Sequence, residues 1–368
     1  MRIAIDAHSV GTQLAGNATY AASIIDALAA IDQKNDYTLY VTLPEAVERY
    51  AGRWPNFQAR RMMAHTPIIR IPLSLSWELR RRPVDILFVQ YTAPPLSPCK
   101  VVTAIHDISY EHLPETFNRR SVMQMKLTIR HTARHAAHII TPSEYSRQDI
   151  IETYKIPASK ITSVPQAPAY LKKVGDPKEI ARVRKRYGLP DEFILGVGSI
   201  QPRKNLVRLI EAYARLSSAG VPPLVLVGRS AWLADDTFDA VRKRNIEDRV
   251  IFTGFVPDED LASLYSGAMF FVYPSFFEGF GLPPLEAMQC GTPVIAGNKT
   301  SIPEVVGDAG LLVDPYDIDA LADAMQKLLS DDSLRNALKQ KGSERVKAFS
   351  WSRTARQTLD IFERIGLE

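Results

Sequence analysis

Short runs of β-branched and aromatic residues recur along the chain, and each is followed by hydrophobic residues at helical spacing. This alternation predicts βαβ units with parallel sheets, which bind ligands beyond the carboxyl ends of their strands. In the first part of the chain, strands are expected at Arg2–Asp6, Tyr37–Thr42, Val84–Val89, Val101–Ile105 and His138–Thr141, and helices at Asn17–Ile31 and Arg120–Ala136. In the second part, strands are expected at Phe193–Val197, Leu224–Val227, Val250–Thr253, Met269–Tyr273 and Pro293–Ala296, and helices at Asn205–Ser218, Asp258–Ser266 and Asp317–Ser330.

A proline-rich stretch without periodicity separates the two series. It runs from Val164 to Tyr170 and ends near Asp176-Pro177, as is typical of a linker between domains. The length of 368 residues suits two α/β domains. We therefore expect two Rossmann-like domains, at residues 1–170 and 171–350, and a C-terminal helix at 351–368 that packs back on the first domain.

Composition narrows the class of protein. With 46% hydrophobic and 23% charged residues, the chain is globular and unsuited to long disordered stretches. Two cysteines, Cys99 and Cys290, imply no disulfide framework. The chain opens on a strand pattern rather than a signal peptide, and no apolar run approaches the ~18 residues of a membrane span. We expect a cytoplasmic protein with no nucleic-acid partner.

The small positive charge is unevenly distributed. The chain has 45 Lys and Arg against 41 Asp and Glu, a net charge of +4, and residues 1–170 hold 19 of the former and 14 of the latter. This excess is either ordinary solvated surface or the mark of a first domain that meets an anionic acceptor or membrane.

The strongest candidate site lies in residues 273–296, which read as strand, glycine-rich loop, short helix and second strand. The pair Pro283-Pro284 suits the first turn of a helix. The backbone N–H groups of Phe280, Gly281 and Leu282 would then lie at the positive end of that helix, where phosphate or sugar oxygens bind.

Two carboxylates flank this loop, Glu278 within it and Glu286 in the first helical turns. A carboxylate that accepts from two neighbouring hydroxyls binds a ribose or hexose diol. Either residue alone also reads as a surface or helix-stabilising Glu, but the pair around this loop favours a sugar site.

The Glu-x7-Glu spacing resembles the signature of the retaining glycosyltransferases of family 4, which have the GT-B fold, two Rossmann-like domains with parallel sheets facing each other across a cleft. The resemblance implies that Glu286 holds the ribose of the nucleotide and that Glu278 contacts the donor sugar. It also assigns the donor to residues 171–350 and the acceptor to residues 1–170.

A basic loop follows the first strand of the second domain, Gly196-Val-Gly198-Ser199-Ile-Gln-Pro-Arg203-Lys204-Asn205. It resembles the family's diphosphate-binding loop, in which cations at a helix N-terminus neutralise the leaving group. Many members carry Arg where this chain has Ser199. Lys204 and Arg203, beside Gly198, are therefore expected to bind the diphosphate.

Two further loops match the family. Gly254 and Val256 lie in Phe252–Leu261, which resembles the segment whose backbone reads the nucleotide base. Gly16 lies in Gly11–Asn17, which resembles the first glycine-rich loop, placed against the donor phosphate and the acceptor.

A histidine ends a predicted strand of the first domain. His106 and Asp107 resemble the family's His-Asp pair, whose His contacts the transferred sugar. His106 would donate to a sugar hydroxyl and position the transition state. Asp107 either fixes the tautomer of His106 or caps the turn.

The resemblance implies retention of anomeric configuration by front-face attack, with the leaving diphosphate serving as base and no protein nucleophile. It implies no metal and no cofactor besides the nucleotide sugar as co-substrate. Two Asp-x-Asp patterns, Asp258-Glu-Asp260 and Asp317-Ile-Asp319, are interpreted as helix caps rather than metal ligands.

The Pro-Arg-Lys-Asn variant, the length and the tail resemble bacterial mannosyltransferases of O-antigen and exopolysaccharide synthesis. This implies transfer of a hexose, first of all mannose from GDP-mannose, to a glycan or lipid-linked glycan hydroxyl. The alternatives are a GT-B nucleotide-sugar epimerase, a dinucleotide-dependent oxidoreductase, and a non-catalytic nucleotide-sugar binding protein. An oxidoreductase is disfavoured because no third glycine completes a Gly-x-Gly-x-x-Gly motif after Gly198.

The predicted helix near residues 119–136 is strongly basic. It carries Arg119, Arg120, Lys126, Arg130 and Arg134, with apolar residues between them. Either this is a solvated amphipathic helix, or its basic face makes a peripheral contact with anionic lipid or a lipid-diphosphate acceptor.

Overall fold

The computed structural model describes residues 1–12, 15–62, 66–169, 171–216 and 220–368. It divides into two compact units. The first unit comprises Met1–Glu111, Arg119–Gln166 and Ser350–Glu368, and the second comprises His112–Asn118 and Ala167–Phe349. Among the described residues, no helix is long and apolar enough to cross a membrane.

A seven-stranded sheet in the order β3-β2-β1-β4-β5-β6-β7 forms the centre of the first unit, and every strand pair is parallel. Its strands are β1 (Arg2–Asp6), β2 (Asp36–Val41), β3 (Phe57–Arg61), β4 (Ile86–Gln90), β5 (Lys100–Ala104), β6 (His138–Thr141) and β7 (Ile161–Ser163). Its helices are α1 (Ala15–Ile31), α2 (Pro44–Tyr50), α3 (Pro67–Ile69), the π-helix η1 (Arg70–Leu75), α4 (Ser76–Arg81), α5 (Ser109–His112), α6 (Arg119–His135), α7 (Glu144–Tyr154), the short η3 (Ala158–Lys160) and α16 (Trp351–Leu367).

The second unit contains a six-stranded parallel sheet in the order β10-β9-β8-β11-β12-β13. Its strands are β8 (Ile194–Val197), β9 (Leu224–Val227), β10 (Val250–Gly254), β11 (Phe270–Tyr273), β12 (Val294–Gly297) and β13 (Gly310–Val313). Its helices are η2 (Pro114–Thr116), α8 (Pro177–Arg186), η4 (Pro202–Lys204), α9 (Leu206–Arg215), α10 (Asp235–Arg244), α11 (Asp258–Gly267), α12 (Leu282–Gln289), α13 (Ile302–Val306), α14 (Ile318–Ser330) and α15 (Asp332–Val346).

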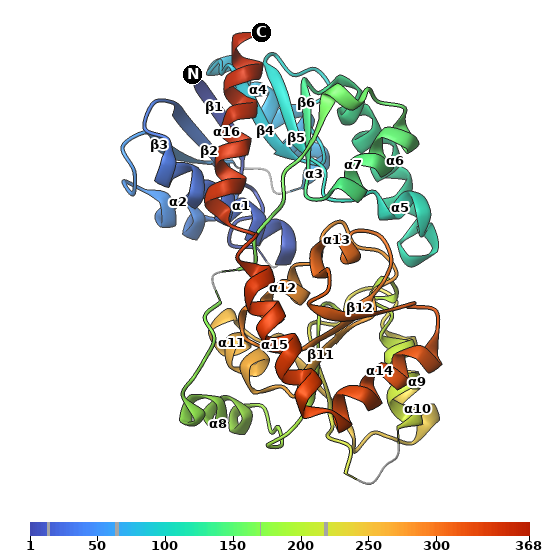
Figure 1. Cartoon of the computed structure of the whole chain (residues 1–368). Helices are drawn as coiled ribbons and strands as arrows, with labels where there is room; N and C mark the ends of the chain where they lie inside the picture. The colour runs from blue at the N-terminus through green and yellow to red at the C-terminus, as the bar shows by residue number, and fades with distance from the viewer. Residues whose placement is uncertain (13–14, 63–65, 170, 217–219) are drawn as a thin grey trace. The chain divides into compact units, whose positions relative to one another are not determined.

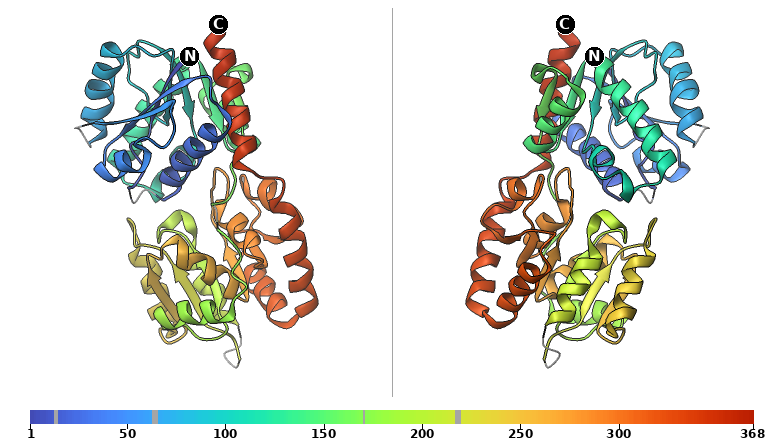
Figure 2. Two further views of the ribbon diagram at one scale, coloured as in Figure 1. Left: turned by 90° about the vertical axis from the view of Figure 1, so that its left-hand side faces the viewer. Right: turned by 90° about the vertical axis from the view of Figure 1, so that its right-hand side faces the viewer.

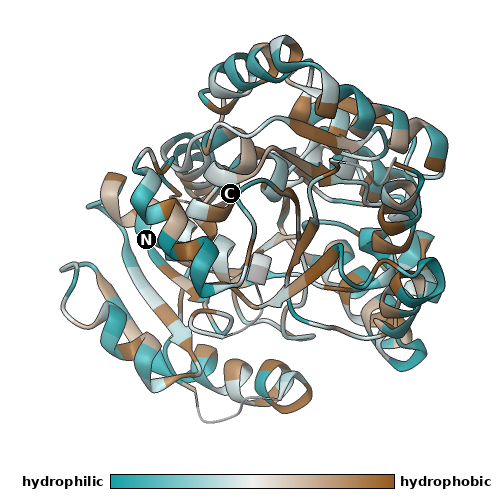
Figure 3. Ribbon diagram, turned by 90° about the horizontal axis from the view of Figure 1, so that it is seen from below, coloured by the Kyte–Doolittle hydropathy of each residue, from teal (hydrophilic) through white to brown (hydrophobic). Residues whose placement is uncertain are grey.

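Each strand of the second sheet is apolar on both sides because helices cover both faces (Figure 2). Leu195 and Val225 point into the core under α11 and α12, whereas their neighbours Ile194 and Leu224 point into the core under α9 and α14. Figure 3 shows hydrophobic residues concentrated in the strands and alternating with hydrophilic ones along the helices. The predicted α/β class, with a parallel sheet in each of two Rossmann-like domains, is confirmed.

The three strands that the pattern did not predict all lie at sheet edges. β3 and β7 form the two edges of the first sheet, and β13 forms one edge of the second. Their pairing, for example Phe57 with Tyr37, joins residues far apart in sequence. Edge strands are paired on one side only and carry a weak local pattern, so only the assembled sheet defines them.

The C-terminal helix α16 belongs to the first unit and packs along α1 (Figure 1). The Phe362 ring lies 5.3 Å from that of Phe88 in β4. Thr354 donates to the carbonyl of Pro165 at 2.6 Å. The units part after Gln166, four residues before the boundary expected at Tyr170, which itself lies outside the described residues.

Candidate active site

Glycines lock together the carboxyl ends of β8, β9 and β10 in the second unit. Gly228 has a φ of 151°, and a Cβ there would lie 2.0 Å from the carbonyl oxygen of Gly198. Its N–H donates to the carbonyl of Gly254, and Gly198 N–H donates to Val227, each at 2.9 Å. Gly198 and Gly254 were predicted; Gly228 was missed, although a glycine directly after a strand was the available signal.

Arg203 and Lys204 both contact Glu278, which lies 75 and 74 positions further along the chain. Lys204 Nζ lies 2.7 Å from Glu278 Oε1 and donates to the Tyr273 hydroxyl at 2.7 Å. Arg203 Nη1 lies 3.0 Å from Glu278 Oε2 and 2.6 Å from the Phe277 carbonyl. We call Arg203, Lys204 and Glu278 the charge cluster; it is largely buried and carries a net charge of +1.

The carboxylate of this cluster is held ionised. Burial by itself raises the pKa of Glu278, but the charges of Arg203 and Lys204 outweigh it and hold that pKa at about 2. Both carboxylate oxygens are engaged by these cations. In this structure Glu278 therefore acts as the counter-ion of the two predicted diphosphate ligands.

Asn205 holds the basic loop against the next strand. Its φ is 57°, and its buried amide donates to the carbonyls of Pro274 and Pro315 at 2.9 and 2.7 Å. This clamp fixes Lys204 beside the loop that carries Glu278. In the sequence, Asn205 is only the last residue of the basic loop. Its clamping role was not predictable because its two acceptors lie 69 and 110 positions further along the chain.

The backbone N–H groups that are predicted to bind an anion lie at the start of α12, as the proline pair indicated. Gly281 is its N-cap with a φ of 117°, and a Cβ there would lie 2.6 Å from Ile302 Cδ1, so glycine is required. Within the described part of the chain, the N–H groups of Phe280, Gly281 and Leu282 have no acceptor. The Phe280 side chain is buried and packs edge-on against Phe349.

Glu286 lies in the middle of α12 and is half-buried. The hydroxyl of Tyr265 in α11 donates to Glu286 Oε2 at 3.1 Å. Burial raises the pKa of Glu286 to about 7, and the charge of Asp258 adds to the rise. The two carboxylates eight positions apart thus have opposite pKa shifts, because only Glu278 has cationic partners.

An exposed aromatic side chain, Phe255, follows β10, and no sequence motif had indicated it. Val256 is buried in the core, whereas Phe255 is exposed with the Arg229 guanidinium 4.4 Å from its ring centroid. Ser199, in the neighbouring loop, accepts from Gln201 Nε2 at 2.9 Å. An aromatic residue between Gly254 and Val256 was the signal for an exposed ring here.

In the first unit, His106 is held between two glutamines. Its Nε2 lies 2.9 Å from Gln90 Oε1, and its Nδ1 lies 2.9 Å from Gln166 Nε2. Gln90 Nε2 donates to the Asn17 carbonyl at 3.1 Å, so Gln90 Oε1 faces the ring and His106 carries its proton on Nε2. To hydrogen-bond to the imidazole, a sugar hydroxyl must displace one of these two amides or share a ring nitrogen with it.

Asp107 does not contact the His106 ring nitrogens; its carboxylate accepts from Ser109 N at 2.9 Å and caps the turn. Of the two roles left open for Asp107, the structure supports capping. Gly16 lies in the first turn of α1 rather than in the preceding loop, because the helix begins two residues earlier than expected. Gln13 and Leu14 of that loop lie outside the described residues.

His106 is expected to remain neutral across the physiological pH range. Burial lowers its pKa to about 4, against a smaller opposing effect of the Asp107 charge. In a protein labelled with ¹⁵N-histidine, the His106 ring should show the Nε2–H tautomer, with no titration above about pH 5. Gln166→Glu should raise its pKa by offering Nδ1 a negative acceptor. Titration of the wild-type ring near its ordinary pKa would contradict this assignment.

The two Asp-x-Asp patterns have different roles. Asp317 caps α14 by accepting from Ala320 N at 2.9 Å, as predicted. The other pattern lies at a helix start, as expected, but it does not cap: α11 begins at Asp258, its N-cap residue is Pro257, and no side chain caps it. Asp260 is instead fully buried and accepts from Arg182, Arg186 and Tyr187 at 2.7–3.0 Å. The described residues contain no group of three or more His, Cys, Asp or Glu side chains arranged for a metal ion.

The predicted basic helix exists as α6, but two of its five cations pair with an acidic residue outside the helix. Lys126 and Arg130 pair with Glu111 at 3.0 and 3.8 Å, and Arg130 also stacks over Tyr154. Arg119, Arg120 and Arg134 are the exposed members. The basic face is therefore smaller than the sequence indicated, because Glu111 lies outside the helix.

Two family models match the chain. The model described as Glycosyl transferases group 1 matches residues 178–345, and the model described as Glycosyltransferase Family 4 matches residues 15–167. Together they cover most of both units.

Curated relatives and solved structures agree with these models. O-antigen chain mannosyltransferase B of Escherichia coli is 39% identical over 267 residues, which are 72% of this chain and 70% of that protein. Serotype-specific mannosyltransferase WbdA of Escherichia coli is 34% identical over 62% of this chain, but over only 29% of its own length. Sucrose-phosphate synthase from Thermosynechococcus elongatus superposes with a TM-score of 0.78 at 22% identity, covering 99% of both chains.

Proposed function

Because the chain belongs to the group 1 glycosyltransferases of family 4, with the GT-B fold, we propose that it transfers mannose from GDP-mannose to a hydroxyl of a glycan or lipid-linked glycan. The enzyme is a hexosyltransferase that uses a nucleotide-sugar donor. The choice of mannose is supported by two relatives of this chain, O-antigen chain mannosyltransferase B and the mannosyltransferase WbdA. Neither these relatives nor the structure favours the epimerase alternative.

The charge cluster next to the start of α12 is the observation that carries the proposal. Lys204 and Arg203 would bind the diphosphate, assisted by the N–H groups of Gly281 and Leu282. Glu286 would accept hydrogen bonds from the ribose. The net charge of the cluster suits a leaving group that gains negative charge as its bond to the sugar breaks.

In the proposed reaction, the bond between the anomeric carbon and the diphosphate oxygen breaks while the acceptor oxygen bonds to the same face of that carbon. The acceptor proton passes to the departing diphosphate, so configuration is retained without a protein nucleophile. Glu278 keeps the two cations in position and, when the donor binds, shares its oxygens with a sugar hydroxyl. The proposed role of His106 is a hydrogen bond to a hydroxyl of the transferred sugar.

The donor is tested by ligand-induced thermal stabilisation with GDP- and UDP-sugars. A ligand present at 100 times its dissociation constant adds about 2.7 kcal/mol to the free energy of unfolding. GDP-mannose should raise the midpoint, and GDP-glucose and UDP-glucose less so. If only UDP-sugars raised the midpoint, the donor would be a UDP-sugar and not GDP-mannose. Consumption of GDP-mannose without any acceptor would instead indicate an epimerase or hydrolase.

Transfer should persist in excess EDTA. The proposed neutralisation of the diphosphate by Lys204 and Arg203 takes the place that a divalent cation occupies in metal-dependent transferases. Initial rates with and without EDTA, on protein first dialysed against chelator, check this expectation. Loss of activity that Mg²⁺ or Mn²⁺ restores would overturn it.

A further inference from the structure

A helical segment of the first unit, α3–η1–α4, is hydrophobic on two opposite sides. Ile71, Leu75 and Leu79 are buried, and Leu75 and Leu79 pack in one core cluster with residues of β1, β2 and β4. Ile69, Leu73 and Trp77, four positions apart, form a stripe on the other side with exposures of 50%, 64% and 65%. A surface helix normally exposes polar residues, so the outer stripe calls for a function.

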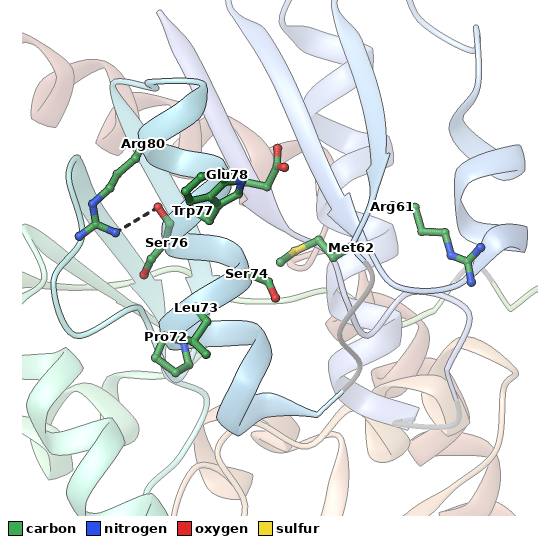
Figure 4. A pocket seen from close by; sticks show the side chains of 9 residues that line it. All are labelled: Arg61, Met62, Pro72, Leu73, Ser74, Ser76, Trp77, Glu78 and Arg80. Atoms are coloured by element: carbon green, nitrogen blue, oxygen red, sulfur yellow. Dashed lines mark hydrogen bonds between the residues drawn. The ribbon is translucent and has the colours of Figure 1, made fainter.

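We call Ile68, Ile69, Leu73 and Trp77 the docking face. They are four of the twelve large hydrophobic residues exposed among the described residues, within ten positions of sequence. Leu73 and Trp77 border a depression of about 570 Å³ (Figure 4). Arg61 and Met62, at the end of β3, lie on its other side. Clustered exposure of this kind marks an interaction surface.

Positive charge surrounds the docking face. Arg61, Arg80 and Arg81 are exposed, and across the described ranges none of them has an acidic partner. The single acidic residue of the segment, Glu78, pairs with Arg82 at 2.5 Å. The rim of the face is thus cationic.

The orientation of the segment is fixed by a buried ion pair. Arg70 Nη1 lies 2.8 and 2.6 Å from the two carboxylate oxygens of Asp6, at the carboxyl end of β1. Burial alone would raise the pKa of Asp6, but His8 and Arg70 hold it at about 2. The ion pair therefore persists across the physiological pH range and keeps the stripe turned away from the sheet.

We propose that this face docks on the surface of an anionic lipid bilayer. Ile68, Ile69, Leu73 and Trp77 enter the boundary between headgroups and acyl chains, where tryptophan is favoured, while the arginines of the rim meet lipid phosphates. A second copy docking through the same face would oppose arginine to arginine, which favours the bilayer as occupant.

Vesicle flotation tests the proposal on the full chain. Wild type should float with vesicles containing phosphatidylglycerol but much less with phosphatidylcholine alone, and less at about 0.5 M than at about 0.05 M salt. Leu73→Asp/Trp77→Asp should lower partitioning at least tenfold, and Arg80→Glu/Arg81→Glu should remove the preference for anionic lipid. Leu96→Asp, at a leucine of the same unit that is more exposed than Leu73, is the matched control and should float as wild type.

Two further measurements separate the competing outcomes. Brominated lipids should quench wild-type fluorescence but not that of Trp77→Phe, and thermal midpoints show that each variant is folded. Failure of wild type to float, or loss of floating only with Arg119→Glu/Arg120→Glu in α6, would overturn the proposal. A concentration-dependent dimer that Trp77→Asp disperses would assign the face to a second copy instead. None of these results depends on the donor sugar, so the proposed function stands or falls separately.

Discussion

Lys204→Met is expected to lower kcat by about 10²–10³, the usual effect of removing one donor to a charge that develops in the transition state. The methionine keeps most of the aliphatic chain beside Gly198 but removes the ammonium group that lies over the Tyr273 ring. Because negative charge on the diphosphate grows as its bond to the sugar breaks, kcat should fall more than the affinity for the donor.

Steady-state kinetics with the stabilising donor check this expectation. Lys341→Met, which removes an exposed lysine paired with Asp308 on the same unit, is the control and should retain activity. An increase in KM with unchanged kcat would assign Lys204 to ground-state binding of the donor. Circular dichroism shows whether loss of a cation beside the buried Glu278 carboxylate has disturbed the fold.

Glu286→Gln is expected to weaken binding of the nucleotide sugar by about 10- to 150-fold, or about 1.5–3 kcal/mol, because ribose hydroxyls lose a charged acceptor. In wild type the affinity should rise between about pH 6 and 8, as the carboxyl with a pKa of about 7 ionises. A nucleotide sugar has no phosphate monoester that titrates in this range. Calorimetric titrations of both proteins across pH measure the effect.

The stability of the free enzyme should vary with pH in the opposite direction. The pKa of Glu286 is raised from 4.5 to about 7 on folding, so its contribution is fully present below pH 4.5 and is lost as pH rises through about 7. Glu286→Gln should therefore gain stability relative to wild type at alkaline pH. Glu344→Gln, an exposed control, should change neither quantity. A pH dependence of binding that persists in Glu286→Gln would remove Glu286 from the ribose site.

The local chemistry of the chain was enough to predict both sheets, most of their strands and the loops at the strand ends. Hydrophobic periodicity and glycine positions report on neighbours a few residues away, and they located the starts of α9 and α12 to within one residue. The same local signals placed Glu278 and Glu286 around the start of α12. They contain no information on what each carboxylate faces.

Only the tertiary structure decided those surroundings. It joined Glu278 to Arg203 and Lys204 and left Glu286 with Tyr265, so that one pKa falls and the other rises. It also placed Gln90 and Gln166 on the two nitrogens of His106, and Glu111 against the cations of α6.

The segment from Pro67 to Arg81 shows why such features escape a sequence pattern. Its apolar residues lie on both sides, so no single hydrophobic stripe marks a helix, and Pro72 argues against one. Packing of Leu75 and Leu79 on the sheet and the Arg70–Asp6 ion pair hold it in place. Local propensity describes what a segment can form, whereas burial and charge partners distant in sequence determine which face is left exposed.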